Sequence, residues 1–253
     1  MYLHHPAVTR LVNSSATSPK VRVFAFPFAG SSASIYHPWK DLISTDIELL
    51  AYTPPGRGGR FSEPNVNRME DLLDDAWTHF APYLDKPYII FGHSLGALLG
   101  FEFLQKSLKT GFSAPLQFIT SARKAPHLPS IDNWTALSDA EFVAKLDELG
   151  GLHPDIAANP DLLSLLMPAL RADISIVEVY QPSSQTAIDT KTTVYGGIHD
   201  TRVPESGLAE WQSYFSPEIN LQMLDAGHFY LSKHAKVLTE QLNQIAKHAY
   251  NRL

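Results

Sequence analysis

Residues 88–104 read Tyr88-Ile-Ile-Phe-Gly-His-Ser-Leu-Gly-Ala-Leu-Leu-Gly-Phe-Glu-Phe-Leu104, and this stretch decides the fold. Its first four residues form a short run typical of a buried strand. Gly92-His-Ser-Leu-Gly96 follows at once and matches the pattern G-x-S-x-G, and a helical pattern begins at Ala97. Strand, turn and helix in this order predict a serine held on a strained turn above a sheet. The alternative is a surface serine in a glycine-rich turn.

The two glycines of this turn have a steric explanation. A serine on a sharp strand-to-helix turn crowds the residues two positions away on either side, and Gly92 and Gly96 remove the Cβ atoms that would clash. The turn then projects the Ser94 hydroxyl above the sheet. The amide of Leu95, at the start of a helix, becomes a donor for an oxyanion. Ser94 is therefore the candidate nucleophile.

Six short runs rich in β-branched and aromatic residues alternate with helical patterns along the chain. One helical pattern spans Met69 to Phe80, where apolar residues recur at spacings of three and four. This alternation predicts an α/β fold with a mostly parallel twisted sheet and helices on both faces. The length fits a single domain over residues 1–253. The expected strands are 21–26, 47–51, 88–91, 116–120, 191–195 and 221–224.

The composition excludes several classes of function. The formal net charge is -6, whereas proteins that neutralise nucleic-acid phosphates are strongly basic. Because the chain has no cysteine, it has no disulfide, thiolate metal site or cysteine nucleophile. Residues 1–20 lack the apolar core of a signal peptide, and the apolar runs are too short to span a membrane. We expect a cytoplasmic monomer with no nucleic-acid partner, no membrane partner and no metal.

The alternation of strands and helices breaks between residues 124 and 180, where two helices are expected without a strand between them. Ser138 and Glu141 have the spacing of a capping box, and Asn159-Pro160 is typical of a helix start. Pro168 should kink or split the second helix. The segment 124–180 is either a helical lid over an active site or a local excursion that covers the sheet edge. As a lid, it would line a substrate passage with apolar side chains: Phe142, Leu146, Leu166, Met167 and Leu170.

A serine hydroxyl needs a base and a carboxylate that orients the base, and both are expected downstream of Ser94. His228 follows the expected strand 221–224, and Asp200 follows the expected strand 191–195, so both would lie beside the turn of Ser94. Asp225 is the alternative acid, but it shares a short loop with His228 and could hardly reach the far ring nitrogen. We expect Ser94, His228 and Asp200 to be the catalytic set. Two other histidines near the motifs are expected to be structural: His93 and His199.

The second oxyanion donor should come from the loop after the first expected strand. Phe26-Pro-Phe-Ala-Gly-Ser-Ser32 occupies that loop, and Pro27 has no N–H to donate. Phe28 is therefore the favoured partner of Leu95 in the oxyanion hole, with Ala29 as the alternative.

Together these features resemble the type II thioesterases, the stand-alone editing hydrolases of nonribosomal peptide and polyketide synthesis. The resemblance covers roughly residues 20–245, and the P-G-R and P-A-L-R-A-D segments are its most particular parts. The motifs that carry it are Phe26-Pro-Phe-Ala-Gly30, Pro55-Gly-Arg-Gly-Gly-Arg60 with Glu63-Pro64, Gly92-His-Ser-Leu-Gly-Ala97, Ser121-Ala-Arg-Lys-Ala-Pro-His-Leu-Pro129, Leu149-Gly-Gly151, Met167-Pro-Ala-Leu-Arg-Ala-Asp173 and Gly227-His-Phe229.

This resemblance implies an α/β-hydrolase fold with an inserted helical lid and a Ser94–Asp200–His228 triad. It also implies acyl thioesters carried by acyl or peptidyl carrier proteins as substrates. The phosphopantetheine arm belongs to the carrier, so no cofactor is expected in the enzyme. The chain departs from the family pattern at Ser31, where the family more often has glycine, and at Ala122 before Arg123-Lys124. Neither departure touches the triad.

Two other functions are compatible with the same motifs. A general carboxylesterase or lipase would use the same triad, and a non-catalytic binding protein could keep the scaffold without the activity. The thioesterase motifs favour a carrier-bound substrate. Because the chain itself carries a net charge of -6, docking to an acidic carrier would need a local basic patch. Four residues near the motif loops could form this patch or be ordinary structural charges: Arg57, Arg60, Arg123 and Lys124.

Overall fold

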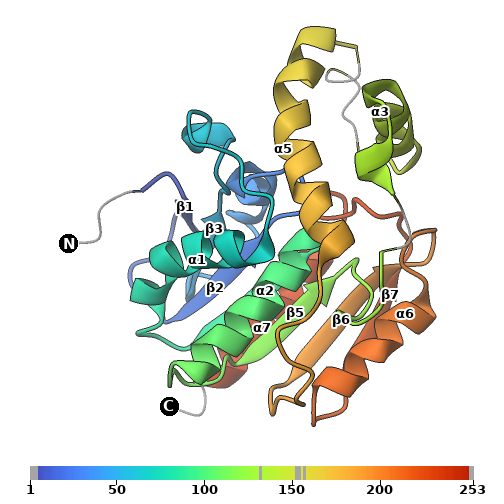
Figure 1. Cartoon of the computed structure of the whole chain (residues 1–253). Helices are drawn as coiled ribbons and strands as arrows, with labels where there is room; N and C mark the ends of the chain where they lie inside the picture. The colour runs from blue at the N-terminus through green and yellow to red at the C-terminus, as the bar shows by residue number, and fades with distance from the viewer. Residues whose placement is uncertain (1–4, 131–132, 152–154, 156–157, 251–253) are drawn as a thin grey trace.

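The computed structural model describes residues 5–130, 133–151, 155 and 158–250. In this part of the chain, seven strands form one sheet in the order β1-β3-β2-β4-β5-β6-β7 (Figure 1). Strand β1 pairs antiparallel with β3, and the other neighbours pair in parallel. The strands are β1 (Val8–Val12), β2 (Val21–Phe26), β3 (Ile47–Tyr52), β4 (Tyr88–His93), β5 (Gln117–Ser121), β6 (Thr192–Gly197) and β7 (Asn220–Leu224).

The mostly parallel α/β sheet predicted from the sequence is confirmed, and all six expected strands are present. The prediction missed β1, an edge strand in a segment for which no strand was expected. Its residues Val8-Thr-Arg-Leu-Val12 include a polar pair and are only partly buried, because an edge strand needs no continuous apolar run.

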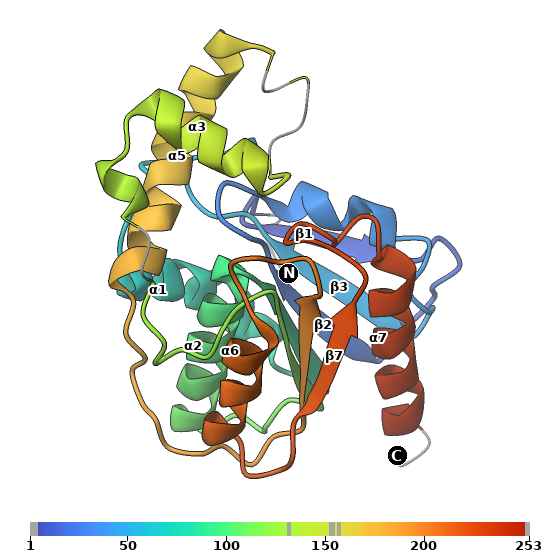
Figure 2. The same cartoon turned by 90° about the vertical axis from the view of Figure 1, so that its right-hand side faces the viewer.

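Helices and short 3₁₀ helices cover both faces of the sheet (Figure 2). On one face, side chains of α1 (Met69–Phe80), α2 (Leu95–Lys109) and α6 (Glu205–Ala209) join a buried cluster with Phe24 and Ile90. On the other face, α7 (Ala235–Tyr250) and the 3₁₀ helix η1 (Ala33–Trp39) pack over Val23 and Phe91. The alternating residues of β2 and β4 therefore serve two cores. The remaining 3₁₀ helices are η2 (Gly58–Arg60), η3 (Ala81–Tyr83), η4 (Trp134–Ala136) and η5 (Glu210–Tyr214).

Two helices, α3 (Asp139–Glu148) and α5 (Pro160–Val179), stand beyond the sheet (Figure 1). Helix α3 begins with the expected capping box, since the Ser138 N–H donates to Glu141 at 2.9 Å and the Ser138 hydroxyl accepts from the Glu141 amide at 3.4 Å. Pro168 lies inside α5 but does not split it, so that part of the expectation is wrong. Of the expected lid segment, residues 131–132, 152–154 and 156–157 lie outside the described residues.

Helix α5 connects α3 to the body of the domain. Its first half joins α3 in a small apolar cluster that includes Phe142 and Met167. Its second half places Ile176 and Val177 in the core beneath α2. Within the described residues, no helix combines the length and the apolar character needed to cross a membrane.

Candidate active site

Ser94 lies at the sharp turn between β4 and α2 with a φ of 55°, in a region that few non-glycine residues adopt. A Cβ atom on Gly92 would lie 2.1 Å from the carbonyl oxygen of Gly96, and one on Gly96 would lie 2.1 Å from that of Phe26. The turn therefore requires glycine at both positions. The Ser94 N–H donates to the carbonyl of Ser121 over 2.8 Å, which ties the turn to the end of β5.

Three side chains from three strand ends meet at this turn. The Nε2 atom of His228, after β7, lies 3.2 Å from Oγ of Ser94. Its Nδ1 atom lies 2.6 Å from Oδ2 of Asp200, after β6. Because a carboxylate can only accept, Nδ1 carries the proton and Nε2 is left as the acceptor for the Ser94 hydroxyl. The structure thus brings Ser94, His228 and Asp200 into one hydrogen-bonded series.

The carboxylate of Asp200 is fixed by its own loop. Its side chain is fully buried, and Oδ1 accepts from the amides of Arg202 and Val203 at 3.0 and 3.3 Å. The alternative acid, Asp225, is exposed and accepts instead from Nε2 of His199 at 2.8 Å. The two candidate acids therefore have different histidine partners, and the partner of Asp200 is His228.

His93, inside the turn motif, supports the loop of His228. Its Nε2 lies 3.0 Å from the main-chain oxygen of His228, and its Nδ1 lies 2.9 Å from Oγ of Ser121. A carbonyl only accepts, so Nε2 donates, and the Ser121 hydroxyl donates to Nδ1. Tyr230 closes the series at 2.6 Å from Ser121. Burial and the neighbouring His228 hold the pKa of His93 well below its ordinary value, which keeps this ring neutral.

The expected oxyanion donors are main-chain amides beside Ser94. Among the described residues, no acceptor takes the N–H of Leu95, Phe28 or Ala29. The loop that carries the last two is held in place, because the Gly30 amide donates to Oδ2 of Asp173 on α5 at 2.7 Å. Three amides without an acceptor beside a candidate nucleophile are suited to stabilising a developing negative charge.

A pocket of about 200 Å³ opens beside Ser94 and His228. Of the five lid residues expected in its lining, Phe142, Leu146 and Leu170 line it. Leu166 and Met167 do not line it, and Met167 instead lines a separate hollow between α3 and α5 with Val143 and Leu163.

Sequence reasoning missed seven apolar lining residues: Ala122 and Val203, which follow β5 and β6, and five in or near α3, α5 and His228. Two of the five lie on α5 a turn or more past Leu170, and one ends α3, so a longer reading of the same helical pattern would have found them. The other two lie in a turn before α3 and directly after His228, where periodicity gives no signal. The five are Ile174, Val177, Leu149, Trp134 and Phe229.

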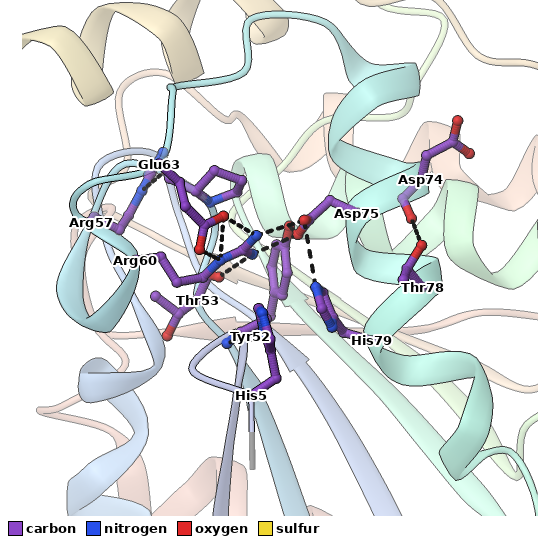
Figure 3. A network of polar contacts seen from close by, with 12 residues as sticks. His5, Tyr52, Thr53, Arg57, Arg60, Glu63, Asp74, Asp75, Thr78 and His79 are labelled. Carbon is purple, nitrogen blue, oxygen red and sulfur yellow. Dashed lines mark hydrogen bonds and ion pairs between the residues drawn. The ribbon is translucent and has the colours of Figure 1, made fainter. Parts of the chain in front are cut away.

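Three of the four residues expected to form a basic docking patch are buried, and the fourth, Lys124, is partly buried. Arg57, Arg60 and Arg123 are buried, with exposed fractions of 4%, 2% and 8%. Figure 3 shows Arg60 between Glu63 and Asp75, whose carboxylates accept from its guanidinium at distances from 2.5 to 3.0 Å. The expectation of a docking patch is therefore wrong for these three arginines. Their positions near motif loops in the sequence do not show that they are buried.

No group of three or more histidine, aspartate or glutamate side chains that could hold a metal ion is found among the described residues. The chemistry available at this site is that of a hydroxyl, an imidazole, a carboxylate and main-chain amides. This set can transfer an acyl group to serine and then to water.

Comparisons with known proteins agree with this chemistry. A thioesterase domain family model matches residues 21–248. The chain is 29% identical to the gramicidin S biosynthesis protein GrsT of Aneurinibacillus migulanus, over 87% of this chain and 85% of that protein. It is 32% identical to a protein of Brevibacillus parabrevis named linear gramicidin dehydrogenase LgrE, over 84% and 82% of the two chains. The solved structure of YbtT, a type II thioesterase from the yersiniabactin NRPS/PKS pathway, superposes with a TM-score of 0.84 at 27% identity, over 96% of this chain and 99% of that one.

The family model covers most of the chain, including every residue of the hydrogen-bonded series. The fold of the solved structure extends over nearly the whole of both chains. The chain belongs to the thioesterase domain family, whose α/β-hydrolase fold it shares.

Proposed function

We propose that this chain is a type II thioesterase that hydrolyses acyl groups from the phosphopantetheine thiol of acyl or peptidyl carrier proteins, as an editing or release enzyme of nonribosomal peptide or polyketide synthesis. Membership of the thioesterase domain family makes it a hydrolase of thioesters. The observation that carries the proposal is the series Ser94–His228–Asp200 at a pocket lined in part by apolar side chains, in a chain of this family. The similarity to YbtT and GrsT, from peptide and polyketide pathways, supports the carrier-bound substrate.

In the first half of the proposed reaction, Ser94 Oγ attacks the thioester carbonyl while His228 Nε2 takes the hydroxyl proton. Asp200 stabilises the imidazolium through Nδ1. The tetrahedral oxyanion accepts from the amides of Leu95 and Phe28, with Ala29 as the alternative to Phe28. The carbon–sulfur bond then breaks, and His228 returns its proton to the leaving thiolate of the carrier. The product is an ester of Ser94.

In the second half, His228 takes a proton from water, and the resulting hydroxide attacks the ester carbonyl. The same amides accept the second oxyanion. Collapse releases the free acid, and the imidazolium returns its proton to Ser94. No cofactor takes part, because the phosphopantetheine arm comes with the carrier.

The helices α3 and α5 form the lid in this proposal, with segment 124–180 inserted in a single domain. Phe142, Leu146 and Leu170 line the pocket with Ser94, and this supports a role in holding the acyl group away from water. Since all three residues of the series come from one chain, we propose a monomer as the acting unit.

The dehydrogenase activity in the name of LgrE is not part of the proposal. A nicotinamide enzyme of the doubly wound type places a G-x-G-x-x-G turn after a strand. The turn after β4 is Gly92-His-Ser-Leu-Gly96 instead, and it presents a serine.

The proposal is tested by mixing the purified chain with an acetyl-loaded carrier protein and measuring release of the carrier thiol. Wild type should release the thiol, and Ser94→Ala should lose nearly all activity while remaining folded. Ser130→Ala is the matched control, because Ser130 lines the same pocket without joining the series. A wild-type chain that cleaves p-nitrophenyl esters but no loaded carrier would be a carboxylesterase. One that binds acyl groups, cleaves neither substrate and does not react with a fluorophosphonate would be a binding protein.

A further inference from the structure

Arg123, two residues after β5, is a buried cation without a partner among the described residues. Its exposed fraction is 8%, and it lines the same pocket as Ser94. Its main-chain oxygen accepts from Nε1 of Trp211 at 2.7 Å, which fixes the backbone. The guanidinium makes no ion pair with any described residue, and its buried Nε has no hydrogen-bond acceptor there. Arg123 thus lines the pocket with an anchored backbone and a guanidinium whose Nε has no partner among the described residues.

The lysine and arginine side chains that line the pocket with Arg123 add further positive charge. Lys124 and Arg202 line the pocket as well, and no aspartate or glutamate is among the described residues that line it. Burial, together with the positive charge of Arg202, lowers the pKa of Arg123 to about 10, and the nearby Tyr180 opposes this only in part. At neutral pH the guanidinium therefore still carries its charge.

An unpaired buried charge is costly, at several kcal/mol per ion even after the protein relaxes. The other buried arginines of the described chain avoid this cost through carboxylates: Arg22 binds Glu48, Arg57 binds Asp173, and Arg60 binds Asp75. Arg123 is the exception to that pattern, and it is the buried arginine that lines the pocket. A partner supplied by a ligand would explain the departure, and the planar fork of a guanidinium matches a carboxylate in two parallel hydrogen bonds.

We propose that Arg123 is the anion-binding residue of the acyl pocket, and that the enzyme prefers acyl groups ending in a carboxylate, the half-thioesters of short dicarboxylic acids. This rests on the proposed thioesterase function and adds a substrate class to it. The same positive charge repels the ammonium group of an aminoacyl substrate. The pocket of about 200 Å³ is small for a ligand site, which favours a short acyl group such as succinyl.

Two groups can supply such an anion. One is the carboxylate at the end of the acyl chain, and the other is the phosphate of the carrier's phosphopantetheine arm. The test therefore uses thioesters of N-acetylcysteamine, which lacks a phosphate. Succinyl and butyryl thioesters form a matched pair, because they differ by a carboxylate in place of a methyl group. For wild type, kcat/KM should be higher for succinyl than for butyryl.

In Arg123→Met, the ratio of kcat/KM for succinyl over butyryl should fall by about tenfold to a hundredfold, mainly through KM, as expected for losing hydrogen bonds to a charged group. Arg123→Lys keeps the charge but loses the fork, so its ratio should lie between those of wild type and Arg123→Met. Lys124→Met removes a charge from the same lining, but its Nζ already binds the carbonyl of Pro129, and it should change the ratio much less. The melting temperature of Arg123→Met should equal or exceed that of wild type, because no native pair is broken.

Equal losses on the two substrates, or an unchanged ratio, would overturn the proposal. So would an effect of Arg123→Met that appears only with phosphate-bearing acyl-phosphopantetheine substrates, since the anion would then be the arm. The proposed function fails separately: a wild-type chain that hydrolyses butyryl thioester without selectivity overturns only the role of Arg123, whereas a chain that hydrolyses no thioester overturns both.

Discussion

The segment after β3 and the pocket after β5 both bury arginines, but they treat the charge differently. After β3, Arg57 pairs with a carboxylate of α5. Arg60 pairs with one carboxylate of its own loop and one of α1 (Figure 3). After β5, Arg123 has no such match among the described residues. Both segments belong to motifs that the sequence singled out, so the motifs alone do not separate the two roles.

Two similar arginine-bearing motifs therefore have different roles: the arginines after β3 hold segments of the fold together, and we propose that the arginine after β5 binds a ligand. Arg57 joins the loop to α5, because both oxygens of Asp173 accept from its guanidinium and one also accepts from the amide of Gly30. A fully paired network of this kind holds parts in place. A buried polar group without a partner in the protein needs another explanation, and for a group in a pocket a bound ligand supplies one. Changes after β3 should therefore lower stability, and changes at the pocket should lower activity.

The largest effect is expected at the acid of the active site. Asp200→Asn should lower kcat on carrier thioesters by about 10⁴-fold, because the amide donates to Nδ1 and leaves the wrong tautomer of His228. Urea unfolding should give nearly the wild-type free energy, since an asparagine oxygen can still accept from the Arg202 and Val203 amides. Asp225→Asn is the control and should keep full activity. A silent Asp200→Asn beside an inactive Asp225→Asn would exchange the two acids.

The next effect tests the paired arginines after β3. Asp173→Ala should lower the free energy of unfolding by about 3–5 kcal/mol, because it leaves Arg57 buried and unpaired. Denaturant unfolding measures this loss. Asp139→Ala removes the exposed partner of Arg171 and should change stability by well under 1 kcal/mol. If the two variants were equally stable, the buried pair would not stabilise the position of α5, and the proposed difference between the two groups of arginines would be wrong.

Much of this molecule could be predicted from local sequence. The buried strands are apolar runs, and the capping box of α3 and the glycines around Ser94 are short-range steric and hydrogen-bonding patterns, so they are legible along the chain. The candidate site followed because parallel strands deliver their carboxyl ends to one edge. For the same reason, Ser94, Asp200 and His228 could be grouped from their positions along the chain.

What could not be predicted depends on contacts between distant segments. The pairing of Arg57 with Asp173 spans 116 positions, and no local pattern distinguishes it from the isolation of Arg123. The lining of the pocket depends on how α5 is rotated, and this places Ile174 in the pocket and Met167 at a separate hollow between α3 and α5. Edge strand β1 was missed because its stability comes from pairing with β3 rather than from its own sequence.

A smaller effect is expected for the shape of the pocket. Leu149→Trp, at the end of α3, should lower kcat/KM for a hexanoyl thioester about tenfold relative to an acetyl thioester, because the added ring takes the space of the longer chain. Met167→Trp is the matched control. It overpacks the lid core and should lower stability by about 1–3 kcal/mol without changing the chain-length ratio. If Met167→Trp changed the ratio and Leu149→Trp did not, the pocket would run along the other side of α5.

The smallest effect concerns Glu63, which pairs with Arg60 after β3, and this effect depends on pH. Hydrogen bonds from Arg60 hold the pKa of Glu63 below its ordinary value, and burial opposes them only weakly. Since this pKa is lower in the folded chain than in the unfolded one, ionised Glu63 stabilises the fold above about pH 5, and the stabilisation is lost as the pH falls through the lowered pKa. Glu63→Gln should therefore be less stable than wild type by about 1 kcal/mol or less at pH 7, because the pair is partly exposed, and equally stable near pH 2.

Thermal unfolding of both chains between pH 2 and pH 7 measures the difference, and Glu240→Gln on the exposed face of α7 should show none at any pH. A stability difference that stayed constant down to pH 2 would mean that Glu63 acts through packing, and the matched charges after β3 would then not be what stabilises that loop.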